Sequence, residues 1–275
     1  MSDIYIIDGV RTPIGAYLGQ YKKTESVELG THCLQDLFHR NNKIAIKDVE
    51  GLVLGQVLTS GLGMNTARQV SLKSGMPQSS FAYVVNQVCG SGMRAAIEDS
   101  LKIYTTEFDL IIAGGQESMS RARHSYLSRT GEKKLGNNVF IDTLVHDGLT
   151  DAFSQEHMGI TAENVAKKYN VTRQEQDQYA YGSYLKTYKA LKNKYFKNEL
   201  CQTTLKDEVR ADTTLVKLSQ LKPVFKKKGS VSAGNASSLN DGAAFLALAS
   251  SEYVKANKIK PIAKVLSWSS SAGNP

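Results

Sequence analysis

The stretch Asn86-Gln-Val-Cys-Gly-Ser-Gly-Met-Arg94 joins an apolar, strand-like run, residues 81–88, to a helical pattern. Apolar and small residues recur there at helical spacing: Met93, Ala96, Ile97, Ser100, Leu101 and Tyr104. Cys89 therefore lies where a strand gives way to a helix. The unpaired N–H groups and the positive dipole end of a helix N-terminus favour a thiolate at such a position.

The two glycines beside Cys89 indicate a reactive cysteine. Gly90 and Gly92 carry no side chains, so a substrate carbonyl can approach the sulfur and nearby backbone donors. The alternative is that Cys89 is a small buried hydrophobe, as many free cysteines are. Strand-Gly-x-Gly-helix junctions have many uses, and spacing alone leaves both interpretations open.

Strand and helix patterns alternate along the first part of the chain and resume near its end. We expect strands at residues 4–7, 52–58, 81–88, 110–113, 243–249 and 262–268, and helices at 26–41 and 66–74. This alternation predicts an α/β fold with a mainly parallel sheet.

A long segment with a different character interrupts this pattern. After Ser118 the sequence is rich in Ser, Gly, Arg and His, and then predicts two helices, the second opened by the capping box Thr172-Arg-Gln-Glu175. We therefore expect one domain formed by residues 1–118 with 250–271, and an insertion at 119–249.

Composition excludes several classes of protein. The N-terminus lacks the features of a signal peptide, and no apolar run is long enough to span a bilayer. Cys33, Cys89 and Cys201 lie far apart, which indicates reduced thiols and a cytoplasmic setting. The five histidines are equally scattered, so we expect no metal site.

The net charge of +8 comes from lysines spread along the chain, with the densest run at Lys226-Lys-Lys228. No nucleic-acid-binding motif accompanies this charge, so we expect no nucleic-acid partner. Two interpretations stay open: a solvated surface, or a basic rim that attracts a polyanionic ligand.

Eight collinear motifs resemble those of the thiolase family, in particular its acetyl-CoA C-acetyltransferase (acetoacetyl-CoA thiolase) branch. They are Arg11-Thr-Pro-Ile-Gly, Gly55-Gln-Val, Asn65-Thr-Ala-Arg-Gln, Asn86-Gln-Val-Cys-Gly-Ser-Gly-Met-Arg, Ala113-Gly-Gly-Gln-Glu-Ser-Met-Ser, His146-Asp-Gly-Leu-Thr-Asp-Ala-Phe, His157-Met-Gly-Ile-Thr-Ala-Glu-Asn-Val-Ala and Ala233-Gly-Asn-Ala-Ser-Ser-Leu-Asn-Asp-Gly-Ala-Ala. The similarity runs from about residue 3 to residue 270.

The resemblance implies a thiolase-like fold: layered α/β/α, with a mainly parallel, mixed five-stranded sheet. The insertion at 119–249 is then the loop domain that holds coenzyme A. The family's C-terminal catalytic half is expected to be missing from this chain. Its Asn-Glu-Ala-Phe, Gly-His-Pro and Cys-x-Gly-Gly-Gly motifs have no match in these 275 residues.

The resemblance also assigns site residues one by one. Cys89 matches the nucleophile that accepts the acyl group as a thioester. The matches to residues that contact coenzyme A are Leu149, His157, Met158, Arg210, Ala233, Ala236 and Ser237. Structural alternatives stay open for three of these: His157 as a core or interface histidine, Ser237 as a turn cap, and Arg210 as an ion-pair partner of Glu208 and Asp212.

The implied activity is that of an acyltransferase acting on acetyl-CoA. Coenzyme A would be a substrate, with no tightly bound cofactor and no metal. The expected partners are a separate C-terminal half and other copies of the chain as a dimer or tetramer, with no membrane. Two alternatives remain: a longer-chain 3-ketoacyl-CoA thiolase, and a truncated, non-catalytic remnant or acyl-CoA-binding half.

Overall fold

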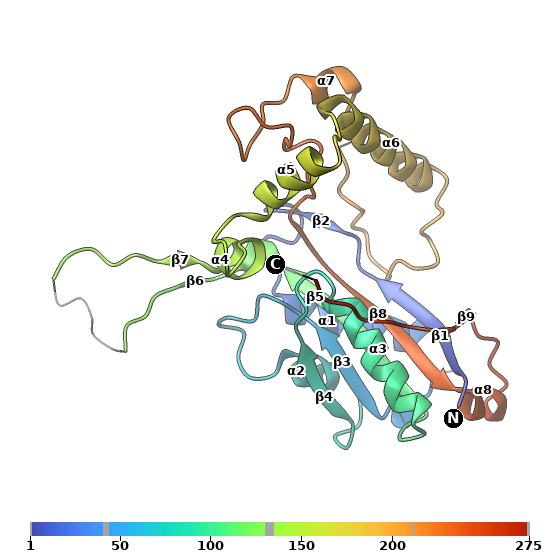
Figure 1. Cartoon of the computed structure of the whole chain (residues 1–275). Coiled ribbons are helices and arrows are strands. Elements are labelled where there is room, and N and C mark those ends of the chain that lie inside the picture. The colour runs from blue at the N-terminus through green and yellow to red at the C-terminus, as the bar shows by residue number, and fades with distance from the viewer. Residues whose placement is uncertain (1, 41–43, 130–134, 211, 274–275) are drawn as a thin grey trace. The chain divides into compact units, whose positions relative to one another are not determined.

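The computed structural model describes residues 2–40, 44–129, 135–210 and 212–273. The chain forms two compact units (Figure 1). The sheet unit comprises Met1–Arg123, Glu199–Lys206 and Asn240–Pro275, and the helical unit comprises His124–Asn198 and Asp207–Leu239. The boundaries expected from the sequence, a domain of residues 1–118 with 250–271 and an insertion at 119–249, remain a prediction.

The sheet unit carries most of the strands. Its strands are β1 (Ile4–Arg11), β2 (Gly15–Ala16), β3 (Gly51–Gly55), β4 (Phe81–Val85), β5 (Leu110–Ser118), β8 (Asn240–Ser250) and β9 (Ala263–Lys264). Its helices are α1 (Ser26–Arg40), α2 (Thr66–Lys73), α3 (Ser91–Tyr104) and α8 (Ser251–Ala256), with short 3₁₀ turns at Ile46–Asp48 and Met119–Arg121.

The strands form one mixed sheet in the order β4-β3-β5-β8-β1-β9, with β2 paired to β8. Parallel pairing joins β3 to β4 and β5, whereas β8 runs antiparallel to β5 and β1. The predicted α/β class and mixed sheet are confirmed. In the described residues the sheet has seven strands rather than the expected five, and four of its six strand pairings are antiparallel, so it is not mainly parallel. The strand expected at 262–268 is shorter, because only Ala263–Lys264 pairs with β1.

Side chains alternate between the two faces of this sheet, as the period of a strand requires. Leu52 and Leu54 of β3 join a buried cluster with α1 and α2. Val53 and Ile111 belong to a second cluster on the α3 face, together with Ala95. Helices therefore cover both faces and make the three-layer α/β/α arrangement within this unit (Figure 1).

The buried face of α3 coincides only in part with the stripe identified in the sequence, of which Ser100 is buried and Ala96 packs against the second cluster. Ala95, Asp99 and Ile103 are fully buried against the sheet. Met93, from the apolar stripe identified in the sequence, is 74% exposed, and Leu101 and Tyr104 are also exposed. Helical spacing predicted the helix correctly, but it does not identify which stripe meets the sheet.

The first turn of α3 lies directly on the backbone of two strands. A methyl group on Gly55, at the end of β3, would lie 2.5 Å from the backbone nitrogen of Gly92. A methyl group on Gly115 of β5 would lie 3.6 Å from the Cα of the same Gly92. The helix can come this close only because β3 presents no side chain there.

The helical unit contains the two-residue strands β6 (His124–Ser125) and β7 (Ile141–Asp142), and the helices α4 (Thr143–Leu149), α5 (Met158–Lys168), α6 (Arg173–Lys192) and α7 (Leu215–Ser219). The predicted capping box of α6 is confirmed: the Thr172 hydroxyl accepts from the Glu175 N–H, and the Glu175 carboxylate accepts from Thr172 N–H. In the described part of the chain, no helix has the length and apolarity to cross a membrane.

The Gly55 contact leads to a first prediction. Gly55→Ala should lower the free energy of unfolding by about 1–3 kcal/mol, because the methyl group meets backbone atoms that cannot rotate away. Gly92→Ala is the matched control, since a methyl group at Gly92 meets nothing within 4 Å. Urea unfolding of both variants measures the difference, and equal stability of the two would contradict the contact.

The buried carboxyl group of Asp99 leads to a second prediction. Neither of its oxygens has a hydrogen-bond partner among the described residues, and burial raises its pKa well above 3.8 despite the opposing charge of Lys102. The folded state therefore holds this proton more tightly than the unfolded state. The protonated Asp99 therefore contributes its full stability below the pKa of the unfolded chain. This contribution is lost as pH rises through the pKa of the folded chain.

We expect Asp99→Asn, which cannot ionise, to retain more of its stability than the parent chain as pH rises from about 4 to about 9. Urea midpoints across this range provide the measurement. Glu98→Gln on the same helix is the control, because Glu98 is only half-buried and pairs with Arg94. Parallel pH profiles for Asp99→Asn and the parent chain would show that Asp99 does not carry this penalty.

Candidate active site

Cys89 is the exposed cysteine of the three, whereas Cys33 and Cys201 are buried. It follows β4 and directly precedes the first turn of α3, as the sequence predicted. The alternative in which Cys89 is a buried core residue is therefore excluded. Its role as a nucleophile stays a prediction.

The residue before Cys89 has a strained backbone. Val88 adopts a φ of 49°, in the left-handed region that β-branched residues rarely enter. Such a conformation costs on the order of 1–3 kcal/mol and persists only where neighbouring groups hold it. Here the Asn86 side chain accepts from the Val88 N–H at 2.9 Å, and the Ser91 hydroxyl donates to the Val88 carbonyl at 2.6 Å.

Polar side chains organise the segment that follows β3, at the same edge of the parallel strands as Cys89. The Glu117 carboxylate accepts from the N–H groups of Val57 at 2.9 Å and Leu58 at 3.3 Å. Burial raises the pKa of Glu117 to about 7, although these two N–H groups act to lower it. Glu117 was not among the candidate residues expected from the sequence. The feature that could have indicated it is a carboxyl group at the end of an apolar strand.

Gln56 extends this network into the interior. Its side-chain amide donates to the Ser26 hydroxyl at 2.9 Å and accepts from Thr66 at 2.7 Å and from the Gln116 amide at 3.0 Å. The network joins the ends of β3 and β5 to the starts of α1 and α2. The loops around the edge of the sheet are therefore held by buried hydrogen bonds.

In the helical unit, His157 caps the N-terminus of α5. Its Nδ1 accepts from the Gly159 N–H at 3.0 Å, which assigns the ring proton to Nε2 and leaves that N–H as a donor. The ring stacks on Phe225 with centroids 4.8 Å apart. Gly159 is required there, because a methyl group on it would lie 2.2 Å from the Phe225 ring. Phe225 was not expected from the sequence, where it appears simply as an aromatic residue within a polar stretch.

Two more predicted residues lie beside His157. A β-bridge between Thr150 and His157 brings the end of α4, where Leu149 lies, to the start of α5. Leu149 is half-buried, and Met158, the first residue of α5, is 48% exposed. These three side chains therefore share one end of α5.

The remaining small residues lie on a tight turn. The Ser232 carbonyl accepts from the N–H groups of Asn235 at 3.2 Å and Ala236 at 3.0 Å, which places Ala233 and Ala236 on the turn. Ser237 follows it, exposed, and its hydroxyl has no hydrogen-bond partner in the part of the chain that the structure describes. The alternative that Ser237 caps this turn is not observed.

This turn is anchored to the helices of the unit. The Asn235 amide donates to the buried Asp177 at 2.9 Å, and Asp177 also pairs with Arg173 at 2.8 Å. The buried Glu163 accepts from the N–H groups of Ser230 and Val231, both at 2.8 Å. Burial favours the protonated form of Glu163, but these donors prevail and its pKa is lowered.

Arg210 is exposed, a few residues before α7, and its carbonyl accepts from the Thr213 hydroxyl at 2.9 Å. The carboxylate of Asp212 pairs with Lys217 at 2.5 Å, and this contact, with a smaller contribution from Arg210, lowers the pKa of Asp212. The ion-pair alternative expected Asp212 to be a partner of Arg210. In the structure the principal partner of Asp212 is Lys217.

The structure thus links six of the seven predicted coenzyme residues within the helical unit. Leu149, His157 and Met158 lie near the start of α5, and His157 stacks on Phe225. The Phe225 loop is closed by a bridge between Pro223 and Ser232, next to the turn of Ala233, Ala236 and Ser237. Arg210 lies on a separate segment, and Cys89 belongs to the sheet unit.

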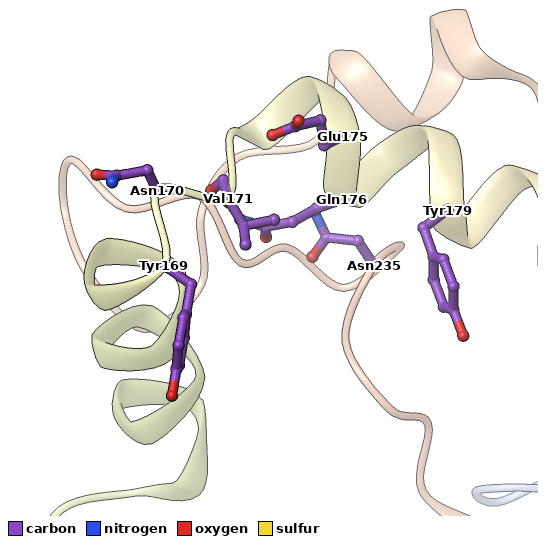
Figure 2. Close-up of a pocket in the computed structure, with 7 residues that line it drawn as sticks. All are labelled: Tyr169, Asn170, Val171, Glu175, Gln176, Tyr179 and Asn235. Atoms are coloured by element: carbon purple, nitrogen blue, oxygen red, sulfur yellow. Dashed lines mark hydrogen bonds between the residues drawn. The ribbon is translucent and has the colours of Figure 1, made fainter.

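A pocket of about 410 Å³ opens elsewhere in the helical unit, between the end of α5 and the start of α6 (Figure 2). None of the predicted site residues lines it; its lining residues are Tyr169, Asn170, Val171, Glu175, Gln176, Tyr179 and Asn235. Asn235, Gln176 and Glu175 already bond neighbouring groups of the protein. Among the residues described, no group of three or more His, Cys, Asp or Glu side chains is arranged to hold a metal ion.

Comparison with known proteins places these features in a family context. The family model for the N-terminal domain of thiolase matches residues 4–252. A probable acetyl-CoA acetyltransferase of Escherichia coli (strain K12) is 42% identical over 287 residues, covering 100% of this chain and 72% of that protein. An acetyl-CoA acetyltransferase of Rhizobium meliloti (strain 1021) is 41% identical over 283 residues, covering 99% of this chain and 72% of that protein.

A solved thiolase structure is also similar to this chain. The crystal structure of Acat5 thiolase from Ascaris suum in complex with coenzyme A is 37% identical, with a TM-score of 0.91 over 96% of this chain and 70% of that chain. The layered α/β fold predicted from the sequence is confirmed by this likeness.

The anchoring of the 221–237 segment leads to a third prediction. Glu163→Ala should lower the free energy of unfolding of the helical unit by about 3 kcal/mol, since it leaves backbone donors of Ser230 and Val231 unpaired. Trypsin should then cut faster after the exposed Lys226–Lys228 run. Because the folded pKa of Glu163 is lowered below 4.5, the stability that its carboxylate contributes should be lost as pH falls through that folded pKa, which urea unfolding measures.

Asn164→Ala is the control for this variant, because Asn164 is the exposed neighbour on the same helix. Equal cleavage rates in Glu163→Ala and Asn164→Ala would show that Glu163 does not hold the segment.

Proposed function

This chain belongs to the thiolase family, and on that premise we propose that Cys89 accepts an acyl group from a coenzyme A thioester. The observation that carries the proposal is an exposed thiol at a strained strand–helix junction, with two buried cysteines elsewhere. The matched relatives named as acetyl-CoA acetyltransferases support acetyl-CoA as the donor.

In the proposed step the Cys89 sulfur attacks the carbonyl carbon of the thioester. A carbon–sulfur bond forms to Cys89, the bond to coenzyme A breaks, and coenzyme A leaves as a thiol after taking up a proton. An acyl-cysteine remains. N–H groups at the start of α3 are suited to stabilise the negative charge that develops on the carbonyl oxygen.

We assign coenzyme A to the surface formed by the start of α5 and the 221–237 segment. Leu149, Met158, Ala233 and Ala236 offer apolar contacts to the pantetheine arm. The His157 Nε2–H and the exposed Ser237 hydroxyl offer hydrogen bonds. Arg210 would serve the phosphate end of the ligand, where a guanidinium suits phosphate oxygens. The structural neighbour that holds coenzyme A supports this class of ligand.

The full reaction of the family would join this acyl group to the α-carbon of a second acetyl-CoA, forming acetoacetyl-CoA and coenzyme A, or run in reverse. That step needs a base and an oxyanion hole. The three motifs that supply them in the family have no match in these 275 residues. We therefore propose that these 275 residues support acylation of Cys89, whereas condensation or thiolysis needs a base and oxyanion donors that are not among them.

The segment His146-Asp-Gly-Leu-Thr-Asp-Ala-Phe favours the acetoacetyl-forming branch over the longer-chain 3-ketoacyl-CoA thiolases. One further candidate is an acyl-CoA-binding half with no chemistry of its own, which the grouping of six candidate coenzyme residues in the helical unit favours. We also retain as proposals a cytoplasmic location, a homo-oligomeric state, and a first domain of residues 1–118 with 250–271 around a loop domain at 119–249.

The acylation proposal predicts covalent transfer to one thiol. Acetyl-CoA should add one acetyl group to the purified chain, and peptide mass spectrometry should locate it on Cys89. Cys89→Ala should abolish the transfer. Cys201→Ala, which removes a buried thiol, should leave it within about twofold, since exposure governs which thiols react.

Repeating the reaction with a longer acyl-CoA separates the two thiolase branches, because the acetoacetyl-forming branch should react faster with acetyl-CoA. Binding of coenzyme A without any acyl transfer would identify the non-catalytic half instead. Thiolysis of acetoacetyl-CoA by these 275 residues, lost in Cys89→Ala, would contradict the proposal that they lack the groups for that step.

A further inference from the structure

The strained turn before Cys89 is held by hydrogen bonds rather than by its own side chain. The Val88 side chain is 49% exposed, so apolar contacts do little to retain its φ of 49°. The bonds that hold the turn come from both sides of the Val88 residue. Asn86 accepts from the Val88 N–H, and Ser91 bonds the Val88 carbonyl.

Ser91 occupies a central place in this set of bonds. Its side-chain oxygen accepts from the Gln87 N–H at 2.9 Å and donates to the Val88 carbonyl at 2.6 Å. Its backbone N–H also donates to the Val88 carbonyl at 3.1 Å. One hydroxyl therefore ties the Asn86–Gln87 peptide to the Val88–Cys89 peptide across Val88, and fixes the direction in which the chain enters Cys89.

Ser91 is itself held firmly. It is 4% exposed, and its backbone lies against Gly55 at the end of β3. Asn86, in contrast, is exposed and contributes a single bond to this turn. The hydroxyl of Ser91 is therefore the link between the rigid sheet and the turn that carries the thiol.

We propose that Ser91 is a positioning residue for Cys89: its hydroxyl holds the left-handed conformation at Val88 and so keeps the thiol exposed at the start of α3. This inference rests on the proposed function for its meaning in acyl transfer. Loss of the hydroxyl should let Val88 relax toward ordinary backbone geometry and turn the Cys89 side chain away from its reactive position.

The test compares Ser91→Ala with Ser100→Ala in the full chain. Ser100 is the matched control, because it is a buried serine on the same helix, and among the described residues its hydroxyl bonds the Ala96 carbonyl and no other group. Two rates are measured per folded molecule, with the folded fraction taken from circular dichroism. One is alkylation of Cys89 by iodoacetamide, which needs no coenzyme A. The other is acetylation by acetyl-CoA at several concentrations.

In Ser91→Ala we expect the maximal acetylation rate to fall about tenfold and the half-saturating acetyl-CoA concentration to stay within about twofold. Alkylation should slow about fivefold, and Ser100→Ala should leave both rates within about twofold. A purely structural role for Ser91 would lower the folded fraction and leave both rates per folded molecule unchanged. That result would overturn the proposal.

Asn86→Ala provides a second variant should Ser91→Ala fail to fold. It removes the acceptor of the Val88 N–H from an exposed position, and both rates should fall about threefold; unchanged rates would again overturn the proposal. If the parent chain is alkylated but not acetylated, the proposed function fails, while slower alkylation in Ser91→Ala still supports the positioning role. Normal acetylation in Ser91→Ala would retain the function and overturn the role of Ser91.

Discussion

The start of α3 rests directly on the backbone of β3, and the candidate active site depends on this contact. Gly55 presents no side chain, so the peptide between Ser91 and Gly92 can lie where a methyl group would otherwise stand. Gly115 on β5 leaves similar room beside Gly92. A helix that begins so close to the strand ends leaves only a short, tightly bonded turn between β4 and α3. Cys89 is carried on that turn.

The same close approach explains which face of α3 is buried. Near the sheet only small groups fit, and Ala95 occupies that position one turn after Ser91. The larger Met93 points outward, and so do Leu101 and Tyr104 farther along the helix. The consequence is that the carboxyl group of Asp99 is buried beside the sheet, while these three larger side chains of the predicted stripe are exposed. Backbone proximity, rather than hydrophobicity alone, determined the orientation of this helix.

Hydrogen bonds make the neighbourhood of Cys89 rigid on both sides. Ser91 and Asn86 hold the turn before the thiol, and Glu117 and Gln56 hold the segment after β3. In the helical unit, Glu163 and Asp177 serve the same purpose for the 221–237 segment. Where such bonds join buried groups, as at Gln56, Glu163 and Asp177, they restrict the geometries that the chain can adopt. Catalytic and binding groups need this restriction more than they need additional stability.

The sequence alone determined the α/β class, most helices and strands, the capping box of α6 and the placement of Cys89 between a strand and a helix. These features depend on local spacing and local chemistry, which a sequence records directly. It also identified the family through motifs that lie along the whole chain. The coenzyme residues were assigned by resemblance, and their roles stay predictions.

Only the tertiary structure decided which stripe of α3 is buried, that β9 is short, and that Val88 is strained. It also identified Phe225 as the partner of His157 and Glu117 as the acceptor for Val57. These two contacts join residues that are far apart in the chain, so no periodic pattern in the sequence predicts them. A side chain's partner is decided by how the backbones come together, and that distance is set by the whole fold.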